Sequence, residues 1–167
     1  MFRTMMLAAA ASACIAAPSA FAQVTVLPTP DFIRVAAGTD EFERQAGRIA
    51  DRQAASPRVR SFGRMMVRDH TDTTMALKQA IRRAGLPPPG PPTLTADQQS
   101  NISALQRLSG PSFDRTYMQQ QIRTHLQALS AMRAYAHAGD NRVLRRAAAD
   151  TVPIVQRHLR MANEINR

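Results

Sequence analysis

Apolar positions recur every three or four residues through most of the chain, in segments long enough to form α-helices. This pattern predicts helices over residues 31–55, 57–84, 95–109, 112–139 and 140–166. No segment shows the alternation of apolar and polar residues that is typical of a half-buried strand. The sequence therefore predicts an all-α protein.

Polar residues at the predicted helix starts support these boundaries. Four of them can begin the long helices as capping residues: Asp31, Ser56, Ser112 and Asp140. Thr95 and Gln98 have the spacing of a capping box at the start of the short helix. Gly110 and Pro111 are expected to end that helix, and Pro153 to kink the last one.

The connections between the helices indicate how they pack. The segment LPPPGPP, residues 86–92, cannot be helical, because proline lacks the backbone donor and its ring clashes with the preceding turn. We expect it to form one stiff crossover. Very short turns join the other long helices in pairs. Four long helices with one long connection are typical of a four-helix bundle, which we assign to residues 31–166.

The N-terminal segment has the features of a secretory signal peptide. Arg3 precedes an apolar stretch over 5–17, and a small-x-small site ends at Ala22. We predict residues 1–22 to be the signal and 23–30 an extended arm, so that the protein is exported to the periplasm or associates with the outer membrane. Cys14, the only cysteine, gives an alternative in which the chain is lipidated there.

The chain is strongly basic, with a formal net charge of +10 at neutral pH, and losing Arg3 would leave about +9. Such a charge favours anionic partners, for which we expect envelope components. The arginines are scattered over every segment and form no stripe interleaved with aromatic residues. We therefore expect no nucleic acid partner. The sequence does not indicate an oligomeric state.

Three histidines lie on the apolar stripes of three different predicted helices. They are His70, His125 and His158, and Glu43 lies next to the stripe of the first helix. Three imidazoles and one carboxylate suit a divalent transition metal such as iron, zinc or copper. Asp69, Asp114 and Tyr117 are near enough in sequence to orient the imidazoles. Val67 and Val155 stand where a carboxylate-bridged di-iron bundle would have glutamates, so a dinuclear oxidase centre is not expected.

We take a structural role as the main interpretation of these residues, with metal binding as its alternative. Buried histidines can hydrogen-bond to one another and to Asp69 and Asp114, which would form a structural polar network that sets the helix register. We expect His137 to be a helix-end residue and the methionines to fill the core. The sequence contains no phosphate-binding loop, nucleophile elbow or metalloprotease motif, so no enzyme activity, catalytic residue or substrate is indicated.

The chain resembles a large bacterial family of exported proteins of unknown function, often labelled outer membrane proteins. The resemblance rests on five segments: FERQAGRIA at 42–50, MMVRDH at 65–70, the Leu-Pro turn at 86–87, LSGPSFDRTYM at 108–118 and VPIVQRHL at 152–159. It implies a ferritin-like bundle, an envelope protein of unassigned activity that could be stress-related, and metal or oxidative chemistry by analogy only.

Overall fold

The computed structural model describes residues 26–167 and consists of helices joined by short connections. The five helices are α1 (Thr29–Gln53), α2 (Pro57–Arg83), α3 (Ala96–Gln106), α4 (Gly110–Ala138) and α5 (Arg142–Ile165). Within these residues, the only β-type pairing is an isolated bridge between Ala54 and Gly110. The predicted all-α bundle, with a proline-rich crossover and a short extra helix, is confirmed. The predicted signal peptide and residues 23–25 of the predicted arm lie outside the described residues. Helix α1 begins at Thr29, so the last two residues of the predicted arm are helical.

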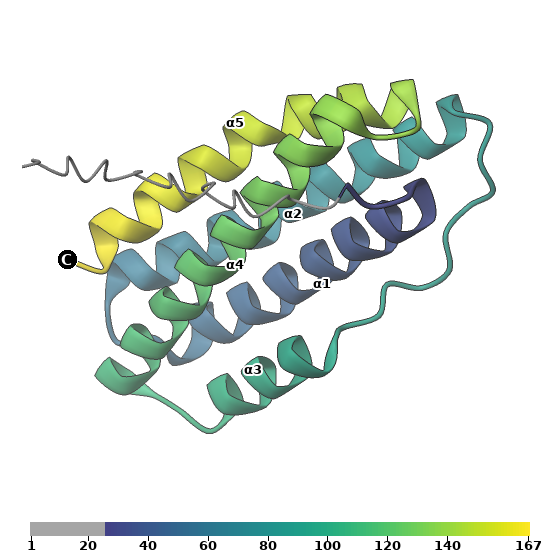
Figure 1. Ribbon diagram of the computed structural model, residues 1–167. Coiled ribbons are helices and arrows are strands. Elements are labelled where there is room, and N and C mark those ends of the chain that lie inside the picture. Colours follow the sequence, from purple (N-terminus) through teal and green to yellow (C-terminus); the bar gives the residue numbers. More distant parts are fainter. Residues whose placement is uncertain (1–25) are drawn as a thin grey trace, which may run out of the picture.

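The four long helices pack as two hairpins side by side (Figure 1). Helices α1 and α2 form one hairpin, α4 and α5 form the other, and α2 packs on α5 while α1 packs on α4. The crossover after α2 leads to α3, which contacts α1 and α4. Helix α3 therefore covers the seam between α1 and α4, whereas the seam between α2 and α5 lies on the other side of the bundle. None of the five helices combines the length and apolar character needed to cross a bilayer.

The apolar core consists of two clusters at opposite ends of the bundle. One contains Phe42, Phe62, Met66, Leu105, Phe113 and Met118 among others, and the second contains Phe32, Leu77, Ile81, Tyr135 and Leu144 among others. Buried polar residues lie between these two clusters on every long helix: Asp40, Glu43, His70, Gln121, His125 and His158. The polar residues therefore occupy the middle of the bundle, where all four long helices meet.

Two of the predicted capping residues have other roles. Helix α1 begins at Thr29, so Asp31 lies inside its first turn and forms an exposed ion pair with Arg34. Asn141, not Asp140, caps α5, and its side chain accepts from the backbone N–H groups of Val143 and Leu144. The Asp140 carboxylate instead accepts hydrogen bonds from Thr29 and Tyr135, which ties the start of α1 to the turn between α4 and α5.

The starts of α2, α3 and α4 also differ in part from expectation. The capping box of Thr95 and Gln98 is confirmed, with both hydrogen bonds present. Ser56 precedes α2, but its side chain makes no capping hydrogen bond. Helix α4 begins at Gly110, two residues before the expected Ser112, because Gly110 adopts a left-handed backbone conformation and Pro111 suits a first helical turn.

Candidate metal centre

Three histidine side chains converge in the middle of the bundle from three different helices. His70 of α2 is 5% exposed, His125 of α4 is 1% exposed and His158 of α5 is fully buried. One ring nitrogen of each histidine lies within 4.8 Å of those of the other two. The ring centroids are 5.3–5.8 Å apart. Helical periodicity thus brings residues that are far apart in the sequence to one point.

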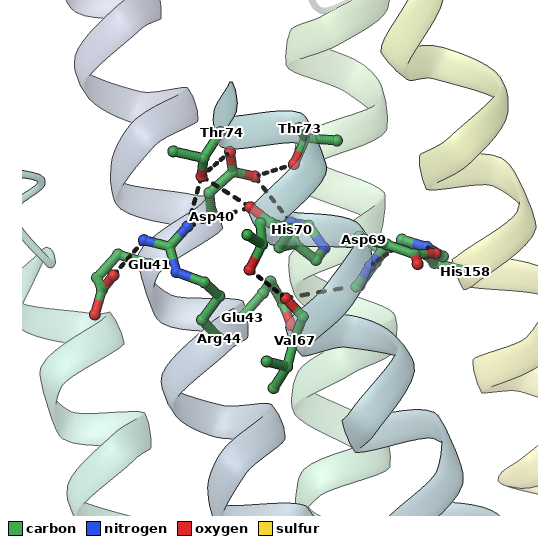
Figure 2. A network of polar contacts seen from close by, with 12 residues as sticks. Asp40, Glu41, Glu43, Arg44, Val67, Asp69, His70, Thr73, Thr74 and His158 are labelled. Carbon is green, nitrogen blue, oxygen red and sulfur yellow. Dashed lines mark hydrogen bonds and ion pairs between the residues drawn. The ribbon is translucent and has the colours of Figure 1, made fainter. Parts of the chain in front are cut away.

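Each imidazole has one nitrogen engaged by an acceptor that fixes its tautomer. Nδ1 of His70 donates to Asp40 Oδ1 at 2.8 Å, and Nε2 of His158 donates to Asp69 Oδ2 at 2.8 Å (Figure 2). Nδ1 of His125 donates to the backbone carbonyl of Gln121 at 2.9 Å. A carboxylate or carbonyl can only accept, so each neutral ring keeps its proton there and has a lone pair on its other nitrogen.

Two of the free nitrogens face each other, and the third is buried. Nε2 of His125 and Nδ1 of His158 are 3.3 Å apart, and Nε2 of His70 is buried without a hydrogen-bond partner among residues 26–167. Two nitrogens bound to one tetrahedral ion at 2.0–2.1 Å would be about 3.3 Å apart. The spacing of this pair and the set of three imidazoles therefore fit a divalent transition metal.

Asp40 is itself held by several donors, so it presents a fixed carboxylate to His70. Besides the imidazole, it accepts from the hydroxyl groups of Thr73 and Thr74, both at 2.9 Å (Figure 2). Arg44 donates to the Thr74 hydroxyl and to the backbone carbonyl of His70. This network links α1 to α2 and restricts the rotation of the His70 ring.

Asp69 has a similar role on the opposite side of the cluster. Its carboxylate accepts from His158 and also from the Arg157 guanidinium at 2.7 Å. Asp69 thus contacts His158 of α5, although it is next to His70 in the sequence. The side chain is partly exposed, so the Arg157 pair lies at the edge of the site.

Glu43 is fully buried beside the cluster, but it is not one of the three converging groups. Its Oε2 accepts from Gln121 at 2.7 Å, and its Oε1 has no hydrogen-bond partner among the described residues. Oε1 is 3.8 Å from Nδ1 of His125, the nitrogen that faces away from the other two histidines. The structure therefore places Glu43 behind the imidazole of His125, where the sequence predicted a direct ligand.

The other two residues expected to orient the imidazoles lie elsewhere. Asp114 accepts from the backbone N–H groups of Ala55 and Ser56 at 3.0 and 2.8 Å, so it stabilises the start of α2. Its expected role beside a histidine is therefore wrong. Tyr117 is fully buried between Phe113 and Phe62, and its hydroxyl has no partner within the described chain. His137 is exposed in the last turn of α4.

Burial, hydrogen bonds and neighbouring charges shift the pKa values of the four buried groups. Burial is the main cause that lowers the pKa of His125 to about 3 and that of His158 to about 4, so both rings are neutral at pH 7. Burial also disfavours the charged form of His70, but the bond to Asp40 and the nearby carboxylates outweigh it and raise the pKa. Burial raises the pKa of Glu43 to about 7.

Sequence reasoning missed two residues of this network, Asp40 and Gln121. Asp40 lies four residues after Ala36 and three before Glu43, and Gln121 lies four residues before His125. Both intervals place them on the same helical face as residues already selected. Helical spacing alone could therefore have identified both residues as part of the network.

Comparison with known proteins shows the family of this chain. The profile of a domain family described as "Domain of unknown function (DUF4142)" matches residues 14–165, almost the entire length. The chain belongs to this family. A search of the curated proteins finds no match. A solved structure titled "CopM in the Cu(II)-bound form" is similar, with a TM-score of 0.70 and 14% identity over 85% of this chain and 97% of that one. At that identity, the similarity shows a shared fold.

Proposed function

We propose that this protein binds one divalent transition-metal ion through His70, His125 and His158. The observation that carries the proposal is the arrangement of the three free nitrogens, each on a ring whose other nitrogen is engaged. Metal-binding histidines in proteins almost always donate their second N–H group to a carboxylate or carbonyl in this way. The predicted ligand atoms are Nε2 of His70, Nε2 of His125 and Nδ1 of His158.

A structural network would leave these nitrogens poorly satisfied. With all three protons engaged by outside acceptors, Nε2 of His125 and Nδ1 of His158 would present two lone pairs to each other at 3.3 Å. The buried Nε2 of His70 would also lack a hydrogen-bond partner among the described residues, whether or not it carries a proton. Burying an unpaired polar atom costs about 1–3 kcal/mol, and a cation placed among the three nitrogens removes that cost.

Copper is the first ion to test. Imidazole binds copper, zinc and nickel well, and among divalent first-row ions Cu²⁺ binds most tightly to a given nitrogen site. The solved structure with the same fold is titled as a Cu(II)-bound form, which makes copper a reasonable starting point for this chain. No cysteine occurs after Cys14, so imidazole nitrogens would dominate the site.

Three protein ligands leave a fourth position open for water or another small ligand. Glu43 cannot supply it without rotating, because its carboxylate lies on the far side of the His125 ring. Its role is to accept from Gln121, whose backbone carbonyl in turn holds the His125 ring. Because no substrate-binding group is identified, the proposal is metal binding, and it assigns no reaction.

Metal analysis of the untagged protein tests the proposal directly. Purified without chelator, the wild type should contain or take up about one Cu²⁺ per chain, and His70→Ala and His125→Ala should lose it. His137→Ala is the matched control, because His137 is exposed and lies outside the cluster. Protein that stays folded but takes up no stoichiometric metal would instead support the structural network.

We also infer that the chain is exported with residues 1–22 removed, and that its basic surface contacts anionic envelope components. The N-terminal charge, apolar stretch and small-x-small site support this inference. Intact mass of the protein from separated cell fractions should show a chain beginning at Gln23. A membrane fraction carrying lipid mass on Cys14 would support the lipidated alternative, and uncleaved Met1 in the cytoplasm would contradict both.

A further inference from the structure

A groove of about 750 Å³ lies between α2 and α5, on the seam that α3 does not cover. Its walls are mostly small or aliphatic side chains such as Ala76, Leu77, Ala147 and Ile154. The groove is partly open to solvent, and the buried Asp40 of α1 is among its lining residues. It therefore leads from the surface toward the polar middle of the bundle.

A small cavity of about 30 Å³, lined in part by His70, adjoins this groove. The two spaces share several lining residues: Phe32, Ala36, Asp40, Thr73, Met132, Thr151 and Ile154. A cavity of this size can hold about one water molecule or one small ion. His70 is the most exposed of the three histidines, and it is the one that lines this cavity. The groove and the cavity therefore mark a route from the surface to the cluster.

Charged residues divide the groove into two ends. Asp72 and Asp150 flank the threonines that border the small cavity, and Asp40 lies at its base. Arg83 and Arg142 lie toward the other end, where α2 ends and α5 begins. Arg146 lies one turn from Asp150 and forms an exposed ion pair with it at 3.1 Å. On a chain with net charge +10, the end next to His70 is still locally acidic, because Asp40, Asp72 and Asp150 face a single arginine there.

We propose that metal ions enter the histidine cluster through this acidic end of the α2–α5 groove, guided by Asp72 and Asp150. The inference rests on the proposed metal binding. A net positive protein repels a cation at long range, but carboxylates around a narrow opening raise the local cation concentration and the association rate. The two aspartates act on entry only, because neither belongs to the converging ligand set.

Stopped-flow measurement of Cu²⁺ binding in a non-coordinating buffer tests the route. At low ionic strength, Asp72→Asn combined with Asp150→Asn should slow association by about threefold or more. Added salt should slow the wild type, since it screens the attraction, and should not slow the double variant. The matched control is Asp51→Asn with Asp97→Asn, which removes the same total charge from exposed residues outside the groove.

A steric variant tests the same route without changing charge. Ile154→Phe should narrow the passage shared by the groove and the cavity, slowing both association and release while the dissociation constant changes little. Leu126→Phe, on an exposed face of α4, is its control. Equal association rates in wild type, the double aspartate variant and Ile154→Phe would overturn the proposed entry route but not the proposed metal binding. A wild type that binds no metal would overturn the proposed function as well.

Discussion

At the residue scale, each histidine of the cluster depends on one acceptor outside it. Asp40, Asp69 and the carbonyl of Gln121 determine which nitrogen of each ring carries the proton. The acceptors come from α1, α2 and α4, so the ring orientations follow from the packing of several helices. Residues that never touch a metal should therefore affect how tightly it binds.

Asp69→Asn tests this dependence at one ring. The amide oxygen can still accept from Nε2 of His158, but the negative charge that faces both His158 and Arg157 is lost. We expect Cu²⁺ affinity to fall about 10–100-fold with the helical content unchanged. Competition titration against a chelator of known affinity measures the change. Asp51→Asn, which removes an exposed ion pair with Arg64, should leave the affinity as it is.

A second residue-scale prediction concerns the hydrogen bonds that Thr29 and Tyr135 donate to the Asp140 carboxylate. Hydrogen bonds from the Thr29 hydroxyl and backbone, and then from Tyr135, hold the pKa of Asp140 below its ordinary value of 3.8. Because the folded pKa is the lower one, this stabilisation is present above about pH 3.8 and is lost as the pH falls through the folded value. Asp140→Asn should therefore lower the free energy of unfolding at pH 7.

The difference between Asp140→Asn and wild type should shrink as the pH falls below about 3.8. Urea unfolding at pH 7, 5 and 3 with chelator present measures it without any contribution from metal. A difference that stays constant over this range would show that the effect of the substitution does not come from the carboxylate charge.

At the scale of the helices, α1 and α2 approach so closely that glycine is needed on both. A Cβ atom added to Gly63 would lie 2.8 Å from the Gly47 carbonyl oxygen and 2.8 Å from Ala50 Cβ. Gly63→Ala should therefore destabilise the fold by about 1–2 kcal/mol, because overpacking outweighs the gain in helix propensity. Chemical denaturation measures this. Gly90→Ala, where nothing lies within 4 Å, should change stability by less than about 0.5 kcal/mol.

The helices themselves could be predicted from the sequence because their signals are local. The predicted stripe of α2 is buried, as the period of 3.6 requires, except for the half-buried Thr73: Val59, Phe62, Met66, His70, Thr73, Leu77 and Ile81. The contacts of Asp114 and Asp140 could not be predicted, because their partners lie 58–59 and 111 residues away in the sequence. Val35 is apolar and yet 36% exposed, because Ile33 and Ala36 form the buried face of α1 at this level.

At the scale of the whole molecule, the cluster separates two apolar cores. Sequence periodicity alone indicated that three histidines face inward, but it did not show that they meet at one level of the bundle. That level depends on the helix register, which the close approach of Gly47 and Gly63 and the turn lengths determine together. Glu43 was expected to join the histidines, yet it lies behind the His125 ring because Gln121 holds it there.

A site made from three helices should couple metal binding to the stability of the entire fold. An ion that binds only the folded state stabilises it by about 2.7 kcal/mol at a free concentration of 100 times its dissociation constant. For a chain of this length, the thermal midpoint should rise by about 5–10 °C with Cu²⁺ and return with chelator. Differential scanning calorimetry measures both changes.

The variants separate the two interpretations of the cluster. His158→Ala should abolish the Cu²⁺-dependent rise, because one ligand from α5 is lost, whereas His137→Ala should retain it. If the wild type shows no rise and His158→Ala melts at a lower temperature, the three imidazoles stabilise the bundle without metal. That result would require a hydrogen-bond partner for the buried Nε2 of His70, which the described chain does not provide, so an ordered water would have to occupy the centre of the cluster.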